Sequence, residues 1–356
     1  MAKEIFVYIG TYSGGGSRGI YCVKLDADHG TLSEPVLAAE QQDPGFLRIS
    51  DGILYCTGDP DGEGDKYCTV ASYRIGQDDG RLQRISSRQV DKLRFCHISL
   101  ADNGRVLLGA DYRHGKTAAF LLGTEGEIDA VAAVLVYAGA SGVNPERQME
   151  PHVHSITPYT KPGYAFVCDF SADAVRCYKT SFEDTSCELS LNDSLFVAAG
   201  AGPRHLVCHP GGKLVYVINE LSNTIATCVF DGGELELVDE VSTLPADFRG
   251  ENTAAEIALS PGTRFLYASN RGHDSIAYYS VDAATGALEL QGVVSSQGEH
   301  PRNFAFTASG KYMVVANRDS NNVVLFKLDK ESGEPVYTGT QVQLSQPMGI
   351  AFCDTK

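Results

Sequence analysis

Charged residues recur at the ends of apolar runs in this chain, and their spacing is regular. Three of these runs end at an asparagine that is followed by a charged residue. In two of the three, the residue 16 positions before that charged residue is an arginine. Arginine guanidinium groups match carboxylates and phosphates through paired hydrogen bonds. If the runs are equivalent units of one fold, the pattern predicts a site for an anionic substrate. The paired positions are Arg204 with Glu220, Ala255 with Arg271, and Arg302 with Arg318.

The unit behind this spacing is a β-hairpin that repeats along the chain. Each copy has an apolar strand, a tight turn containing glycine, a second strand and a polar loop, as in residues 205–213 and 303–311. The copies begin near positions 46, 97, 153, 205, 256, 303 and 349, so the period is about 50 residues. This period is typical of propeller blades that contain four strands.

The two ends of the chain complete the repeat. The last copy has a single strand at 349–352, while the strands at 5–9 and 19–23 have no preceding partner. Pairing the last strand with these N-terminal strands closes a ring and removes two exposed sheet edges. The sequence therefore predicts an all-β, seven-bladed β-propeller with four strands per blade, formed as a single domain by residues 1–356. A pair of β-sandwiches or an open solenoid is the alternative, and both leave the terminal strands unexplained.

In such a ring, the first strand of a hairpin begins where the second strand ends, at one end of the central opening. We align Pro151-His152 with Pro203-Arg204, because Pro158 and Pro210 each follow the first proline by seven residues. His154 shares a face with His152, since side chains alternate along a strand, so either histidine is a candidate. The residues predicted to converge at this opening are His152, Arg204, Glu220, Arg271, Arg302 and Arg318, with His154 beside them and Tyr12 and Tyr112 near the rim.

Three other interpretations apply to these residues. The repeated Asn219, Asn270 and Asn317 are expected to bond backbone in the loop that follows each of them and to belong to the scaffold. The arginines can instead pair with carboxylates at the rim. Glu150, His152 and His154 resemble a set of metal ligands, but no further ligand occupies a comparable position and the nearby arginines would repel a cation. We therefore predict neither a metal nor a cofactor.

Composition excludes several classes of partner. The formal charge of −16 argues against nucleic acid and against an anionic membrane surface. No run of 18 apolar residues is present, so no membrane span is expected. The N-terminus has no signal-peptide pattern, and the ten cysteines form no CxxC pair and lie mostly in apolar runs. We expect buried, reduced cysteines and a cytoplasmic protein.

The chain resembles the propeller-type 6-phosphogluconolactonase family over essentially its whole length. The resemblance is carried by the segment Gly-Ala-Gly-Pro-Arg-His at 200–205, by Val-Ile-Asn-Glu-Leu at 217–221 and by Tyr-Ile-Gly-Thr-Tyr at 8–12. The Asn-Arg pairs at 270–271 and 317–318 agree with it. That family is similar to the fungal carboxy-cis,cis-muconate lactonising enzyme, whose site involves a histidine, two arginines and a glutamate. By motif, these correspond here to His152, Arg204, Glu220 and Arg271.

The resemblance implies hydrolysis of 6-phosphoglucono-δ-lactone to 6-phosphogluconate, a step of the pentose phosphate pathway, and so a small anionic sugar lactone as the substrate. Ester hydrolysis needs an activated water, a stabilised oxyanion and an acid for the leaving oxygen. We assign Glu220 as general base and His152 as proton donor, roles that can be exchanged. Arg204 and Arg271 would stabilise the oxyanion, and Arg302 and Arg318 would hold the phosphate. The alternatives are a cycloisomerase acting on a muconate-type lactone and a non-enzymatic interaction platform.

Overall fold

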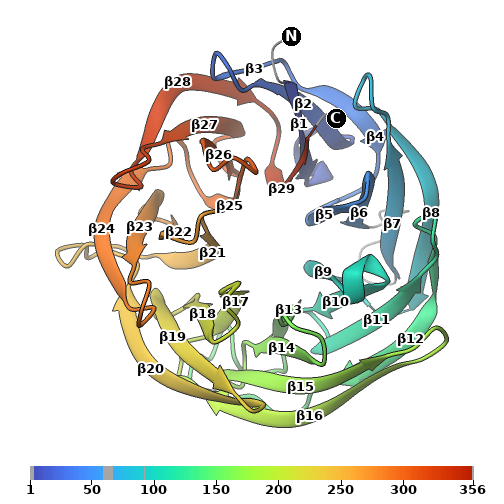
Figure 1. The fold of residues 1–356 in the computed structure, drawn as a ribbon, viewed down its shortest axis with the longest axis vertical. Coiled ribbons are helices and arrows are strands. Elements are labelled where there is room, and N and C mark those ends of the chain that lie inside the picture. Colours follow the sequence, from blue (N-terminus) through green and yellow to red (C-terminus); the bar gives the residue numbers. More distant parts are fainter. Residues whose placement is uncertain (1–3, 59–66, 92, 355–356) are drawn as a thin grey trace.

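The computed structural model describes residues 4–58, 67–91 and 93–354. These residues form seven twisted antiparallel sheets arranged as a ring around a central opening (Figure 1). Six of the sheets contain four strands. The remaining sheet contains five, because its outer position is divided between two short strands. The only helices among the described residues are two 3₁₀ turns, at Ser13–Gly15 and Asp102–Gly104. The predicted seven-bladed, all-β propeller is confirmed.

We number the blades in chain order and call the sheet that contains both ends of the chain blade 1. Blade 1 consists of β29 (Pro347–Asp354), β1 (Glu4–Thr11), β2 (Gly19–Asp26), β3 (Thr31–Leu32) and β4 (Val36–Glu40). Blade 2 consists of β5 (Leu47–Ser50), β6 (Ile53–Gly58), β7 (Tyr67–Ile75) and β8 (Leu82–Asp91), and blade 3 of β9 (His97–Ala101), β10 (Val106–Asp111), β11 (Lys116–Leu122) and β12 (Ile128–Val136).

The remaining blades follow the same order from the centre outwards. Blade 4 consists of β13 (Val153–Pro158), β14 (Tyr164–Asp169), β15 (Ala174–Phe182) and β16 (Cys187–Phe196), and blade 5 of β17 (Pro203–Cys208), β18 (Leu214–Asn219), β19 (Thr224–Asp231) and β20 (Glu234–Ser242). Blade 6 consists of β21 (Thr253–Leu259), β22 (Phe265–Arg271), β23 (Ser275–Val281) and β24 (Leu288–Ser295), and blade 7 of β25 (Pro301–Phe306), β26 (Tyr312–Asn317), β27 (Asn322–Leu328) and β28 (Pro335–Gln343).

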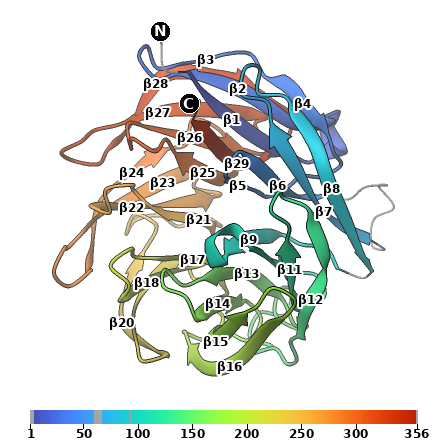
Figure 2. The same cartoon turned by 45° about the vertical axis from the view of Figure 1, so that its right-hand side comes forward.

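The ring closes where the two ends of the chain meet. Strand β29 is the innermost strand of blade 1 and pairs antiparallel with β1, with Ile350 opposite Ile9 and Phe352 opposite Val7. Figure 2 shows the same arrangement from another angle, with β29 beside β1. The last strand therefore occupies the place that the first strand occupies in the other blades, which is the predicted closure.

The core is distributed over the interfaces between neighbouring blades. Side chains alternate between the two faces of a strand, so β1 serves two interfaces at once. Ile5, Val7 and Ile9 pack against blade 7, while Phe6 and Tyr8 pack against blade 2. Each of the seven junctions has such a cluster. The blades thus pack face to face, and the edges of the innermost strands are directed to the centre of the ring.

Candidate active site

A β-bulge at the start of the innermost strand places one residue of several blades at the central opening. In blade 5, Pro203 pairs with Asn219 and His205 pairs with Ile218, so Arg204 is left between them without a partner. The same shift leaves Arg302 unpaired in blade 7 and Met348 unpaired in blade 1. Bulges re-aim a side chain at the edge of a ladder. All three of these bulged residues line one cavity.

The bulge in blade 4 falls on His154 rather than on His152. Val153 pairs with Asp169 and Ser155 with Cys168, which leaves His154 unpaired in the position that corresponds to Arg204. His154 also stands 16 residues before Phe170, the spacing that separates Arg204 from Glu220. The alignment through Pro151 and Pro158 was therefore two residues out of register. The constant spacing of 16 was the signal that identifies the structural equivalent.

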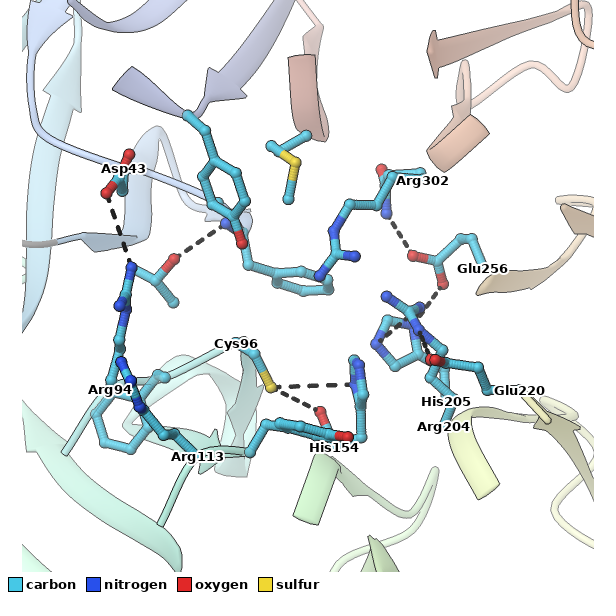
Figure 3. Close-up of a pocket in the computed structure, with 18 of the residues that line it drawn as sticks. Asp43, Arg94, Cys96, Arg113, His154, Arg204, His205, Glu220, Glu256 and Arg302 are labelled. Atoms are coloured by element: carbon cyan, nitrogen blue, oxygen red, sulfur yellow. Dashed lines mark hydrogen bonds and ion pairs between the residues drawn. The ribbon is translucent and has the colours of Figure 1, made fainter. Parts of the chain in front are cut away.

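The bulged residues line a cavity of about 330 Å³ on the axis of the propeller, which is within the usual size of a small-molecule site. Its lining contains six arginines and three carboxylates, in a chain whose formal charge is −16. Figure 3 shows Arg94 and Arg113 on the opposite side of the cavity from Arg204 and Glu220. The arginines are Arg94, Arg113, Arg147, Arg204, Arg271 and Arg302, and the carboxylates are Asp43, Glu220 and Glu256.

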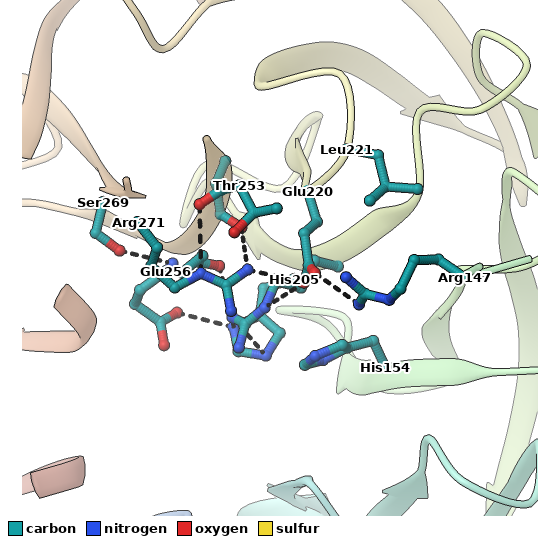
Figure 4. Close-up of polar contacts among 12 residues, drawn as sticks. Arg147, His154, His205, Glu220, Leu221, Thr253, Glu256, Ser269 and Arg271 are labelled. Carbon is teal, nitrogen blue, oxygen red and sulfur yellow. Dashed lines mark hydrogen bonds and ion pairs between the residues drawn. The ribbon is translucent and has the colours of Figure 1, made fainter. Parts of the chain in front are cut away.

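Glu220 is the centre of the charged cluster, and its carboxylate contacts three arginines (Figure 4). Oε2 lies 3.1 Å from Nε of Arg204 and 3.1 Å from Nη2 of Arg271. Oε1 accepts a hydrogen bond of 2.8 Å from Nη2 of Arg147. Burial acts to raise the pKa of Glu220, but Arg271, Arg204 and Arg147 outweigh it and bring the pKa to about 2. Such a carboxylate is a poor proton acceptor near neutral pH, so this geometry favours an orienting role for Glu220.

Arg204 and Arg271 are fixed by backbone as well as by Glu220. Arg204 donates to the carbonyl of Ala255 at 2.6 Å, and Arg271 donates to the carbonyl of Ala254 at 3.0 Å. Burial, reinforced by Arg271 and Arg302, lowers the pKa of Arg204 to about 9, so its guanidinium remains charged near neutral pH. Two charged guanidinium groups in fixed positions are suited to stabilising an oxyanion.

His154 and His152 have different surroundings. His154 is buried and lines the cavity, and burial together with Arg204 and His205 lowers its pKa well below the ordinary value. Its imidazole is therefore neutral near pH 7 and able to accept a proton. His152 does not line the cavity. Its ring stacks on Tyr112 with 4.3 Å between the centroids, and its Nδ1 donates to the Tyr112 carbonyl at 2.7 Å.

Arg302 and Arg318, the two arginines predicted to hold the phosphate, also differ in their surroundings. Arg302 lines the cavity and makes no hydrogen bond or ion pair with any described residue. Arg318 does not line the cavity, and its Nε contacts Oδ1 of Asp319 at 2.6 Å beside His300. Tyr12 and Tyr112 both contribute to the lining. Of the nine predicted side chains, the cavity brings seven together: Tyr12, Tyr112, His154, Arg204, Glu220, Arg271 and Arg302.

A belt of side chains forms the floor of the cavity, and three of its members, His205, Glu256 and Asn303, lie next to the bulges of blades 5, 6 and 7. His205 contacts Oε1 of Glu256 at 3.1 Å, and Asn303 donates to the other oxygen of Glu256. Phe46 and His97 continue the belt, with ring centroids 4.6 Å apart, and His97 lies 5.1 Å from His205. A second cavity on the far side of the belt shares His205, Glu256 and Asn303. His205 and Glu256 were not in the sequence prediction, although His205 directly follows Arg204.

The repeated asparagines belong to the scaffold in this structure. Asn270 donates to the carbonyl of Thr243 at 2.7 Å, and Asn317 donates to the carbonyl of Ser296 at 3.0 Å. Both acceptors follow the outer strand of the preceding blade, whereas the expected acceptors were in the loop after the asparagine, so these amides join neighbouring blades. Over the ranges 4–58, 67–91 and 93–354, no three side chains of His, Cys, Asp or Glu gather into a possible metal site, and no helix is long and apolar enough to cross a membrane.

Known proteins share both the fold and the length of this chain. Residues 6–352 match the family described as "Lactonase, 7-bladed beta-propeller", and the chain belongs to this family. Among its relatives is a 6-phosphogluconolactonase of Bacillus subtilis, 34% identical over 97% of both chains. A second relative, a 6-phosphogluconolactonase of Formosa agariphila, is 31% identical over 81% of this chain and 82% of its own. The structure of a periplasmic gluconolactonase from Pseudomonas aeruginosa superposes with a TM-score of 0.92 at 30% identity, covering 99% of this chain and 100% of the other.

Proposed function

We propose that this protein hydrolyses 6-phosphoglucono-δ-lactone to 6-phosphogluconate, as the names of its two relatives indicate for those proteins, and that it serves the pentose phosphate pathway. One observation carries the proposal. Arg204 and Arg271 are held on a single buried carboxylate, Glu220, beside the neutral imidazole of His154 in a cavity rich in arginine. This combination supplies an oxyanion site and one proton carrier that both activates the water and protonates the leaving oxygen, which meets the three needs of lactone hydrolysis.

The reaction begins when water attacks the lactone carbonyl carbon and His154 accepts the proton of that water. The carbonyl oxygen becomes an oxyanion, which Arg204 and Arg271 stabilise. The bond between the carbonyl carbon and the ring oxygen then breaks, and His154 returns the proton to that oxygen, so one imidazole acts first as base and then as acid. Glu220 fixes both guanidinium groups, and Arg302 adds a further positive charge to the cavity.

The proposal differs from the assignment made on sequence in two roles. Glu220 was the expected base and His152 the expected acid. Glu220 is committed to three arginines, and His152 donates to the backbone of Tyr112 outside the cavity lining. His154 takes over the proton transfer in this account because it is the neutral histidine at a bulge position.

A coupled assay for 6-phosphogluconate tests the proposal, with subtraction of the fast spontaneous hydrolysis of the lactone. Purified protein is expected to accelerate formation of the product, and to act weakly or not at all on muconolactones in the same panel. Turnover of a muconolactone without that of a sugar lactone would favour the cycloisomerase. The absence of turnover of every lactone would favour a binding platform.

We also propose that the protein acts in the cytoplasm. Six of the cysteines with described side chains are buried in the hydrophobic clusters between and within blades, as is usual for cysteines that serve as small apolar residues in a reducing compartment. The Pseudomonas aeruginosa neighbour is named periplasmic, so fractionation of the producing cell is the appropriate test.

A further inference from the structure

One arginine of the cavity comes from outside the repeated strands. Arg147 lies on the loop of residues 137–152, which connects β12 of blade 3 to β13 of blade 4. This loop has no counterpart at the bulge positions, so the repeat does not predict its side chains. Arg147 nevertheless lines the same cavity as Arg204 and Arg271.

The loop is fixed in place by its own hydrogen bonds. Gln148 is completely buried, and its Nε2 donates to the Phe170 carbonyl at 2.9 Å and to Oδ1 of Asp173 at 2.7 Å. Asn144 closes the turn, because its side chain accepts from the backbone of Glu146 and Arg147. The neighbour of Gln148 in sequence, Arg147, is therefore presented at a defined position.

The guanidinium of Arg147 is held on one side and free on the other. Nη2 contacts Oε1 of Glu220 at 2.8 Å and the Tyr112 hydroxyl at 3.2 Å, while Nε lies 3.3 Å from that hydroxyl. The group also stands over the ring of Phe170, 5.1 Å from its centroid. Nη1 makes no hydrogen bond with any described residue. Two N–H donors on a preorganised guanidinium are thus available to a ligand.

The arginines that contact Glu220 lie at different depths in the cavity, as the exposed fractions of their side chains show. Side chains of Arg204 and Arg271 are 2% and 7% exposed, whereas that of Arg147 is 36% exposed. The deep pair lies beside His154, where the lactone carbonyl reacts in the proposed mechanism. With the carbonyl end of the lactone at this depth, the more exposed Arg147 is left for the opposite end of the substrate, which carries the exocyclic carbon. A phosphate there brings a charge of about −1.5 to −2 and three strong acceptor oxygens.

We propose that Arg147 is the specificity-determining residue that selects phosphorylated over unphosphorylated sugar lactones, an inference that rests on the proposed function. Its free Nη1 donors bind the phosphate oxygens of the substrate, and its contacts with Glu220 and Tyr112 hold the guanidinium in place. The excess of positive charge supports this, because three arginines share the one carboxylate of Glu220. A phosphate at the mouth supplies the missing negative charge.

The test compares two substrates, 6-phosphoglucono-δ-lactone and glucono-δ-lactone, on the whole protein. Arg147→Met is expected to lower kcat/KM for the phosphorylated lactone about tenfold or more, mainly through KM, and to change that for the unphosphorylated lactone less than about threefold. Arg147→Lys keeps the charge without the fork and is expected to lie between wild type and Arg147→Met. Arg105→Met is the matched control, because Arg105 is exposed, pairs with Asp102 and does not line the cavity.

Two kinetic outcomes would overturn the inference. Equal losses on both lactones mean that Arg147 acts through Glu220, and no loss on either means that the phosphate binds elsewhere. If the wild-type protein accelerates neither lactone, the proposed function fails, and calorimetric titration with 6-phosphogluconate and gluconate then decides the role of Arg147. A preference for the phosphorylated compound that Arg147→Met removes supports it. Wild type and Arg147→Met with equal affinities for 6-phosphogluconate would refute it.

Discussion

Arg204 and Glu220 are 16 positions apart in the chain, yet Nε of the arginine lies 3.1 Å from Oε2 of the glutamate. The hairpin of β17 and β18 brings them together, because the bulge at Arg204 and the residue after Asn219 lie at the same end of blade 5. Both side chains are almost completely buried. A buried carboxylate in contact with several arginines fixes the positions of their guanidinium groups.

Replacement of Glu220 by Gln is expected to destabilise the protein at neutral pH by about 3–5 kcal/mol, since it leaves three neighbouring arginines without their counter-charge. The pKa of Glu220 is about 2 in the folded protein, against an ordinary value of 4.5. Wild type therefore has the full stabilisation above pH 4.5 and loses it as the pH falls from about 4.5 to about 2. Urea denaturation at several pH values should show that the difference in unfolding free energy between wild type and variant becomes smaller as the pH falls through this window. A gap independent of pH would contradict the role of the carboxylate charge.

The two histidines of the segment 152–154 are expected to respond differently to the same substitution. His154→Asn should lower kcat by about 10²–10⁴, the usual range for loss of a general acid–base group. His152→Asn should have a small effect, because His152 packs on Tyr112 outside the cavity lining. Lactone hydrolysis by the two purified variants, with circular dichroism as a check of folding, provides the comparison. A larger loss for His152→Asn would return the proton transfer to the residue first assigned.

The pH dependence of kcat/KM follows from the state of His154. Burial, with Arg204 and His205 next in effect, lowers its pKa well below 6.5. The imidazole must be neutral to accept a proton, so activity should be constant as the pH falls from 8 through 6.5 and should decline only further into the acid range. Initial rates from pH 4.5 to 8.5, corrected for spontaneous hydrolysis, test this. An acid limb with a midpoint at or above 6.5 would be inconsistent with His154 as the base.

Closure of the ring depends on β29, which is the last strand of the chain. Ile350 is 4% exposed, faces Ile9 across the ladder and packs in the cluster between blades 1 and 7. Ile350→Ala should cost about 2–5 kcal/mol of unfolding free energy. Val336→Ala, on the outer strand β28 where the side chain is 50% exposed, should cost less than about 0.5 kcal/mol. Urea unfolding monitored by fluorescence measures both, and equal costs would argue against a closed ring.

The features that could be predicted from the sequence are those that the repeat itself determines. The period of about 50 residues and the unpaired last strand lead to seven blades and to closure by β29. The spacing of 16 leads to the meeting of Arg204 with Glu220 and places Arg271 beside them, because equivalent positions in equivalent hairpins lie at one end of the ring.

Other features depend on local details that the repeat does not determine. The bulge falls on His154, and prolines at Pro151 and Pro158 obscured its equivalence to Arg204. Arg318 occupies the position equivalent to Glu220 and Arg271, but its side chain pairs with Asp319. Arg147 comes from a connecting loop whose path is set by the buried Gln148. Side-chain direction and loop path both depend on tertiary contacts, which a spacing pattern does not contain.

The most direct test of the account is the rate of 6-phosphogluconate release by wild type and by Arg271→Gln, because Arg271 is assigned to the oxyanion and not to the proton transfer. Wild type should accelerate hydrolysis clearly above the spontaneous rate. Arg271→Gln should lower kcat by about 10²–10³, the usual cost of losing one oxyanion donor. A wild-type protein that leaves the spontaneous rate unchanged, or a variant as active as wild type, would contradict the account.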